Sequence, residues 1–128
     1  MEAADARRLF ASARVARMAT AGPHLVPITF AIEDDVVFTA VDHKPKRTTA
    51  LKRLANIARD PRVSLLADHY EEDWTALWWA RADGTAVVHE RHPRAVELLR
   101  RRYAQYADRP PDGPVIEVTV ERWSGWRA

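Results

Sequence analysis

The sequence predicts a mainly β protein, an antiparallel barrel with helices packed outside it. Runs of β-branched or alternating residues recur along the 128-residue chain, and about seven of them have strand length. Most of these runs follow one another on short turns, which favours antiparallel neighbours. Only two longer segments and one short opening segment have the spacing of a helix. These observations together favour a barrel over a layered α/β fold.

Strand patterns occur at residues 15–20, 25–32, 36–41, 63–67, 74–82, 85–89 and 115–123. The turn Ala21-Gly22-Pro23 ends the first run, and an acidic turn at 33–35 follows the second. The second run is mostly apolar, so we expect it to be buried on both faces or to line a cavity. Pro27 cannot donate to a sheet ladder, which places its end of that run at an edge or a bulge.

Asp83-Gly84 lies between the fifth and sixth runs and is one of the stronger short signals for a hairpin. We therefore expect two strands here, joined by a two-residue turn. The last run alternates polar with apolar residues, as a half-exposed strand does. Because the chain shows neither a repeat nor a linker, we expect residues 1–128 to form one domain.

Helical spacing occurs in three places. Residues 3–13 predict a short opening helix. A second helix is expected after residue 47, with Thr48 or Thr49 as its cap and Asp60-Pro61 as its end. Pro93 opens the third helix, whose apolar stripe consists of Val96, Leu99, Tyr103 and Tyr106.

The composition excludes several classes of site. The chain has no cysteine, which excludes disulfides, thiol nucleophiles and cysteine-ligated metals. Its four glycines lack the spacing of a dinucleotide or Walker fingerprint. The chain has neither the roughly 20 consecutive apolar residues of a membrane span nor a secretory signal. We therefore expect a cytoplasmic protein without a membrane span.

The lysines are concentrated in one segment. Of the 20 basic residues, only Lys44, Lys46 and Lys52 are lysines, and they fall within nine residues. The segment joins a strand end to a helix N-terminus, where cations and free backbone N–H groups suit a phosphate or a polycarboxylate. A solvated basic loop is the alternative. Nucleic acid is disfavoured, because the net charge is only +2 and acidic residues flank the segment.

Tryptophans indicate a second possible contact surface. Trp78 and Trp79 are adjacent in a strand pattern, so their side chains point to opposite faces. One can enter the core, and the other needs a subunit interface or a flat cofactor ring. Trp123 and Trp126 are interpreted in the same way, as interface residues first and pocket walls second.

Metal and nucleophile motifs are weak. His89 and His92 have the spacing of a ligand pair, but they lie at a strand end before Pro93 and no HExxH motif or cysteine accompanies them. We therefore expect no metal site. The three serines lie outside any G-x-S-x-G turn, so the expected chemistry belongs to a bound cofactor.

Several segments match a known group of proteins. They are VARMAT at 15–20, HLVPITF at 24–30, KPKR at 44–47, NIARDPRVSL at 56–65, DW at 73–74, DGTA at 83–86 and ERWSGW at 121–126. On these segments the chain resembles the small split β-barrel proteins of the pyridoxamine-phosphate-oxidase-like superfamily. Within it, the chain resembles the actinobacterial oxidoreductases that use the deazaflavin coenzyme F-420. The NIARDPRVS and DGTA segments are typical of the superfamily and do not distinguish deazaflavin binders from FMN or haem binders.

The resemblance implies a homodimeric split barrel of six to seven antiparallel strands, with two cofactor sites at the subunit interface. The cofactor ring would lie against the strand around Thr29, and its phosphate would meet the lysine-rich segment. The expected cofactor-binding residues are Pro27, Ile28, Thr29, Thr39, Ala40, Lys44, Lys46, Arg47, Thr48, Lys52, Arg53 and Trp79. The neighbouring subunit would contribute the strand of Trp79 or the C-terminal segment.

The implied activity is hydride transfer between F-420 and a small unsaturated or oxidised substrate, such as a quinone, an enone or a tetrapyrrole. The alternatives on the same fold are an FMN-binding oxidase or reductase and a non-catalytic cofactor-binding protein. The sequence does not identify a catalytic residue, because the expected chemistry is carried by the cofactor.

Overall fold

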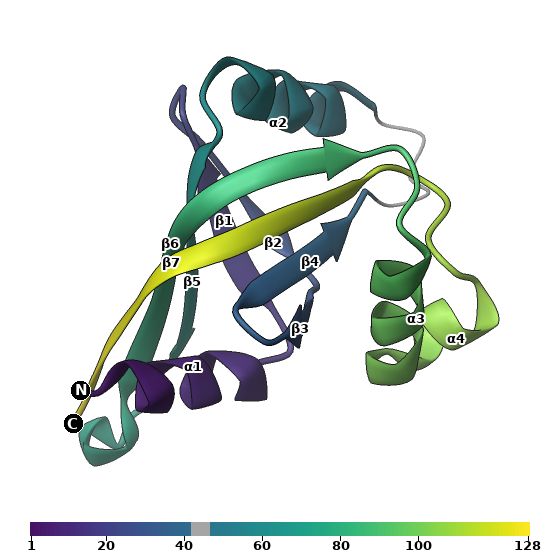
Figure 1. Cartoon of the computed structure of the whole chain (residues 1–128). Coiled ribbons are helices and arrows are strands. Elements are labelled where there is room, and N and C mark those ends of the chain that lie inside the picture. Colours follow the sequence, from purple (N-terminus) through teal and green to yellow (C-terminus); the bar gives the residue numbers. More distant parts are fainter. Residues whose placement is uncertain (42–46) are drawn as a thin grey trace.

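The described part of the chain forms a seven-stranded antiparallel sheet that curls into a half-barrel (Figure 1). The computed structural model describes residues 1–41 and 47–128, and residues 47–51 by their backbone alone. The strands are β1 (Ala16–Thr20), β2 (His24–Ile28), β3 (Ala31–Glu33), β4 (Val36–Ala40), β5 (Arg62–His69), β6 (Trp78–His89) and β7 (Val115–Arg127). Their order across the sheet is β2-β1-β5-β6-β7-β4-β3. The mainly β antiparallel fold is therefore confirmed.

The two edges of this sheet belong to one short stretch of chain. β2 and β3 lie at opposite edges, yet only Thr29 and Phe30 separate them. Such a link spans at most about 10 Å, so the edges must approach each other. The expected single strand at 25–32 is therefore wrong, because the chain changes edges in the middle of that apolar run.

Helices cover the ends and one side of the barrel. They are α1 (Ala3–Ser12), α2 (Arg47–Arg59), α3 (Pro93–Arg102), α4 (Ala104–Asp108) and the 3-10 turn η1 (Trp74–Ala76). α1 and α2 lie at opposite ends of the curled sheet, and their Phe10 and Ile57 join the central core (Figure 1). α3 packs outside β3 and β4, where Leu99 belongs to a second buried cluster. In the described ranges, no helix is long and apolar enough to cross a membrane.

The expected hairpin at Asp83-Gly84 is wrong. β6 runs unbroken through these residues, and its register with β7 shifts between them as a β-bulge. A Cβ on Gly84 would lie 2.1 Å from the carbonyl oxygen of Thr119. Glycine is therefore needed here because two backbones approach closely, and not because the chain turns.

Two helix predictions also need correction. α2 begins at Arg47, so Thr48 and Thr49 lie inside its first turn and do not cap it. The third helix stops at Arg102, because Tyr103 is extended (φ −122°, ψ 122°), and α4 begins after it. The acidic turn before β4 is confirmed, with Asp34 at a φ of 54°.

Candidate functional site

The strand predicted to contact the cofactor ring ends at the link between the sheet edges. Pro27 pairs with Arg17, and Ile28 pairs with Ala16. Ile28 is buried in the core. Thr29 lies in the link, and its hydroxyl is 3.1 Å from the hydroxyl of Tyr106 in α4. Of these residues, Thr29 therefore holds a polar atom whose position is fixed by a second element.

Backbone groups in the same link are held by Tyr103. Its hydroxyl accepts from the Phe30 N–H at 3.1 Å and lies 2.9 Å from the carbonyl oxygen of Arg14. The Arg102 guanidinium lies over the Phe30 ring, 4.8 Å from its centroid, and donates to the Ala11 carbonyl. The start of α4 and the end of α1 thus both fix this link.

Thr39 and Ala40 close β4 with buried side chains. Thr39 pairs with Ile116, whereas Ala40 belongs to the cluster under α3. They are 1% and 6% exposed. A cofactor bound to this chain alone would therefore meet their backbone atoms and not their side chains.

The lysine-rich segment is described only from its helical end. Lys44 and Lys46 lie outside the described residues, and the side chains of Arg47 and Thr48 are not described. α2 begins at Arg47, after Lys44 and Lys46, and its first turn contains no acidic residue. Farther along α2, Lys52 is exposed and Arg53 is half-buried. A helix N-terminus close to basic residues is an arrangement that favours an anion.

Trp78 and Trp79 point to opposite faces of β6, as expected. Trp78 packs against the central core. Trp79 lies on the outer face, where its partner in β7 is Trp126, which is 43% exposed. Leu66 and Val87 add exposed apolar area to β5 and β6. The outer surface of the sheet therefore carries two paired indoles and two aliphatic side chains.

Trp123 differs from the expectation of an interface residue. Its ring packs against Phe10 of α1 at 5.4 Å between centroids, and its indole N–H donates to Asp35 at 3.0 Å. It therefore belongs to the packing of its own barrel end.

An open groove of about 450 Å³ lies beside the β-bulge. Its lining comes from β1, β5, β6 and β7 and from the turns that follow β1 and precede β5. Asp60 in the turn before β5 accepts from the backbone and guanidinium of Arg62, and this pairing lowers the pKa of Asp60 to about 2. Among the described residues, none of the expected cofactor contacts lines this groove. This groove is therefore separate from the predicted cofactor contacts that the structure describes.

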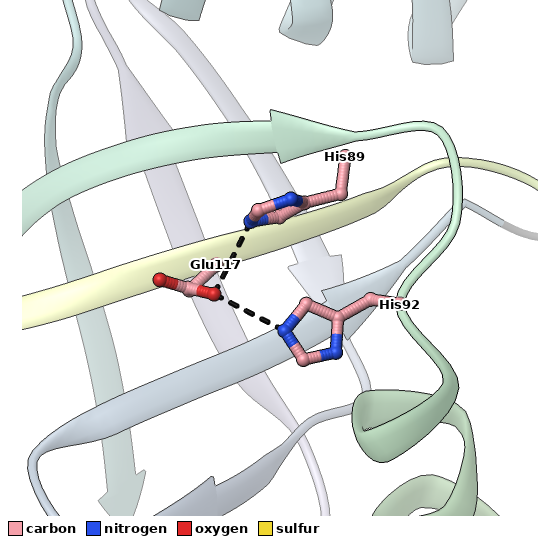
Figure 2. Close-up of side chains that lie close together, drawn as sticks. All are labelled: His89, His92 and Glu117. Atoms are coloured by element: carbon pink, nitrogen blue, oxygen red, sulfur yellow. Dashed lines mark hydrogen bonds and ion pairs between the residues drawn. The ribbon is translucent and has the colours of Figure 1, made fainter.

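His89, His92 and Glu117 form a polar cluster outside the predicted cofactor site (Figure 2). The Nε2 atom of each ring lies 3.2 Å from the same carboxylate oxygen of Glu117. The two histidines were recognised from their spacing, but Glu117 was not. Its only sequence signal is an acidic residue in the alternating pattern of the last strand, which is typical of a solvent-facing position.

The curled antiparallel sheet, whose edges meet at a two-residue link and whose ends carry helices, places the protein in the class of split β-barrels. Residues 3–127 match the family model described as pyridoxamine 5′-phosphate oxidase, and the chain belongs to that family. The resemblance stated from the sequence is confirmed at this level. No curated protein matches the chain.

Solved structures share the fold at low sequence identity. A conserved hypothetical protein of Mycobacterium tuberculosis has a TM-score of 0.75 at 20% identity, over 99% of this chain and 85% of that one. An FAD-binding protein of Mesorhizobium loti has a TM-score of 0.73 at 18% identity, over 98% and 94%. A heme-binding protein of Mycobacterium smegmatis has a TM-score of 0.73 at 21% identity, over 98% and 54%. These likenesses show the fold alone.

Proposed function

We propose that this protein is an F-420-dependent oxidoreductase. It transfers a hydride between the deazaflavin and a small unsaturated or oxidised organic molecule. The observation that carries the proposal is the N-terminus of α2, which follows the lysine-rich segment and has no acidic residue in its first turn. A phosphate or polycarboxylate tail is the ligand that such a terminus favours.

The proposed assembly is a homodimer, with residues 1–128 forming one domain in each subunit. One observation supports it: the outer face of the sheet carries the Trp79–Trp126 pair, and Trp126 is 43% exposed. Burying such aromatic pairs between subunits is favourable, because each ring removes a large apolar area from water. A second copy would complete the ring site with its own tryptophans.

The cofactor supplies the hydride chemistry when it is bound. The chain positions and shields it. The Thr29 hydroxyl, held at 3.1 Å by Tyr106, is a polar group of fixed position that can hydrogen-bond to a ring or substrate atom. The basic residues of α2 hold the anionic tail, and the Trp79–Trp126 pair keeps water from the ring.

The flavin alternative rests on the fold shared with the FAD-binding protein of Mesorhizobium loti. Titration of the purified homodimer with F-420, FMN, FAD and haem, followed by fluorescence or absorbance, separates the candidates. We expect F-420 to bind most tightly. Protein that purifies yellow with flavin, or that prefers haem, contradicts the assignment. Binding of F-420 without reduction of any quinone, enone or tetrapyrrole supports the non-catalytic alternative.

The double variant K46A/K52A tests the phosphate contact. Each charge-assisted contact is worth about 1.5–3 kcal/mol, so losing one weakens F-420 binding by at least about tenfold. The matched control is R8A/R101A, which removes two exposed positive charges from α1 and α3. Equal dissociation constants for the two variants would indicate that the lysine-rich segment is a solvated basic loop that does not contact the phosphate.

A further inference from the structure

His89, His92 and Glu117 come from three separate elements and converge where α3 begins (Figure 2). His89 ends β6, His92 is the N-cap residue of α3, and Glu117 lies in β7. One ligand atom from each residue lies within 4.8 Å of the other two. We propose that this trio binds a divalent transition-metal ion of the zinc class, independently of the cofactor proposed above.

The donor set and its spacing fit such an ion. Two imidazole nitrogens and one carboxylate oxygen suit zinc and its neighbours, and they suit magnesium or calcium poorly. With bonds of about 2.0–2.1 Å, neighbouring ligands of a tetrahedral zinc ion lie about 3.3 Å apart. Both Nε2 atoms already lie 3.2 Å from Glu117 Oε1. Two of the three ligand–ligand distances therefore already match such an ion, and the two nitrogens lie within 4.8 Å of each other.

The site is ordered yet open to solvent. The ring of His92 packs against Phe38 at 4.8 Å and against the ring of His89 at 5.0 Å, measured between centroids. These contacts fix the directions of both rings. The side chains of His89, His92 and Glu117 are 34%, 21% and 27% exposed. A fourth position is therefore left for water or a small ligand, as in three-ligand zinc sites.

Metal binding has one structural cost here. The Nδ1 atom of His92 accepts the Ala95 N–H at 3.1 Å, so the proton of the neutral ring lies on Nε2. An ion on Nε2 moves that proton to Nδ1 and breaks the cap. The positive end of α3 also opposes a cation, which reduces the affinity by a factor of about two to five. These costs are small compared with the free energy gained from three metal–ligand bonds. The lost cap predicts that metal binding loosens the first turn of α3.

The test uses the full chain without added histidines, stripped of metal and free of cofactor. Zinc is titrated against a fluorescent chelator, and cobalt is followed by its visible spectrum. We expect one ion per chain with micromolar or tighter affinity. H92N and E117Q should each bind at least tenfold more weakly. Asparagine is itself a good N-cap, so H92N removes the ligand and keeps the helix start.

The matched control is H69Q, because His69 contacts Glu71 in a similar pair at the exposed end of β5. H69Q should bind zinc as the unaltered chain does. Zinc should also speed hydrogen exchange at the Ala95 amide, which an idle hydrogen-bonded cluster would not do. Absence of micromolar binding overturns the proposal, as does stoichiometric binding that survives both H92N and E117Q in folded protein.

Discussion

The Tyr103 hydroxyl accepts the backbone N–H of Phe30 at 3.1 Å, in the link where the chain passes from one edge of the sheet to the other. A backbone donor at this break in the ladder would otherwise lack a strand partner. One side chain at the end of α3 thus replaces a missing strand contact. Phe30 itself is fully buried, so water cannot take over that role.

Removing this hydroxyl should destabilise the barrel. Y103F leaves the Phe30 N–H buried without its partner, which costs about 1–3 kcal/mol. Urea unfolding followed by tryptophan fluorescence measures the loss. The control is Y70F, since Tyr70 is 65% exposed and its hydroxyl should not affect stability. Equal midpoints for Y103F and Y70F would contradict a stabilising role for the link.

Adding a methyl group at the β-bulge should strongly destabilise the fold. In G84A the new Cβ would lie 2.1 Å from the Thr119 carbonyl oxygen, and backbone cannot move aside as a flexible side chain can. We expect a loss of about 3 kcal/mol or more, at the upper end for overpacking. T85A, at the next position, should cost well under half of that. A G84A protein as stable as T85A would mean that the two strands do not approach so closely.

The Asp60–Arg62 pair gives a defined pH dependence. The pairing lowers the pKa of Asp60 from 3.8 to about 2. A carboxylate with a lowered folded-state pKa stabilises the fold above pH 3.8, and this contribution disappears as the pH falls towards 2. D60N should therefore have a lower urea midpoint than the unaltered chain at pH 7, and the difference should shrink between pH 4 and pH 2. R62Q should show the same pattern, and a pH-independent difference in both variants would contradict it.

A charge on the outer face should separate the proposed subunits. Leu66 is 38% exposed, so L66E should leave the fold of one chain intact. In a dimer it would take a carboxylate out of water beside Arg17 and Arg81, which already pair with Asp68 and Asp83, and this desolvation is unfavourable. We expect L66E to elute as a monomer and to bind F-420 weakly. V15E places the same charge at a residue that is 42% exposed, outside the sheet, and should leave the mass unchanged. If L66E remains a dimer, the subunit interface does not include the surface around Leu66.

Sequence patterns predicted the fold class and the segments that form β1, β4, β5 and β7, but not how the chain divides at 25–32 and at 74–89. The run at 25–32 is two strands, because its change of edge depends on Tyr103, far along the chain. Residues 78–89 are one strand, because Asp83-Gly84 is a bulge that faces Thr119. In both places the strand boundaries depend on a residue that is distant in sequence. Local strand propensity contains no information about such a contact.

The candidate sites follow the same rule. The start of α2 close to Lys44 and Lys46 was predictable, because it depends on residues that are neighbours in the sequence. The approach of Glu117 to His89 and His92 was not. Glu117 pairs with Val87, two residues before His89, so the register of β6 with β7 decides that approach. The pairing register of two strands that are far apart in sequence cannot be predicted from the pattern of either strand alone.

The two-residue link between β2 and β3 also protects the protein from aggregation. Unpaired strand edges recruit other chains, and in the described sheet both edges lie within residues 24–33. Pro27 withholds a donor from one edge, and the other edge is only three residues long. Folding the two edges towards each other leaves little template for an intruding strand. The barrel can therefore expose apolar side chains such as Leu66 and Trp126 on its outer face without also offering an open ladder of hydrogen bonds.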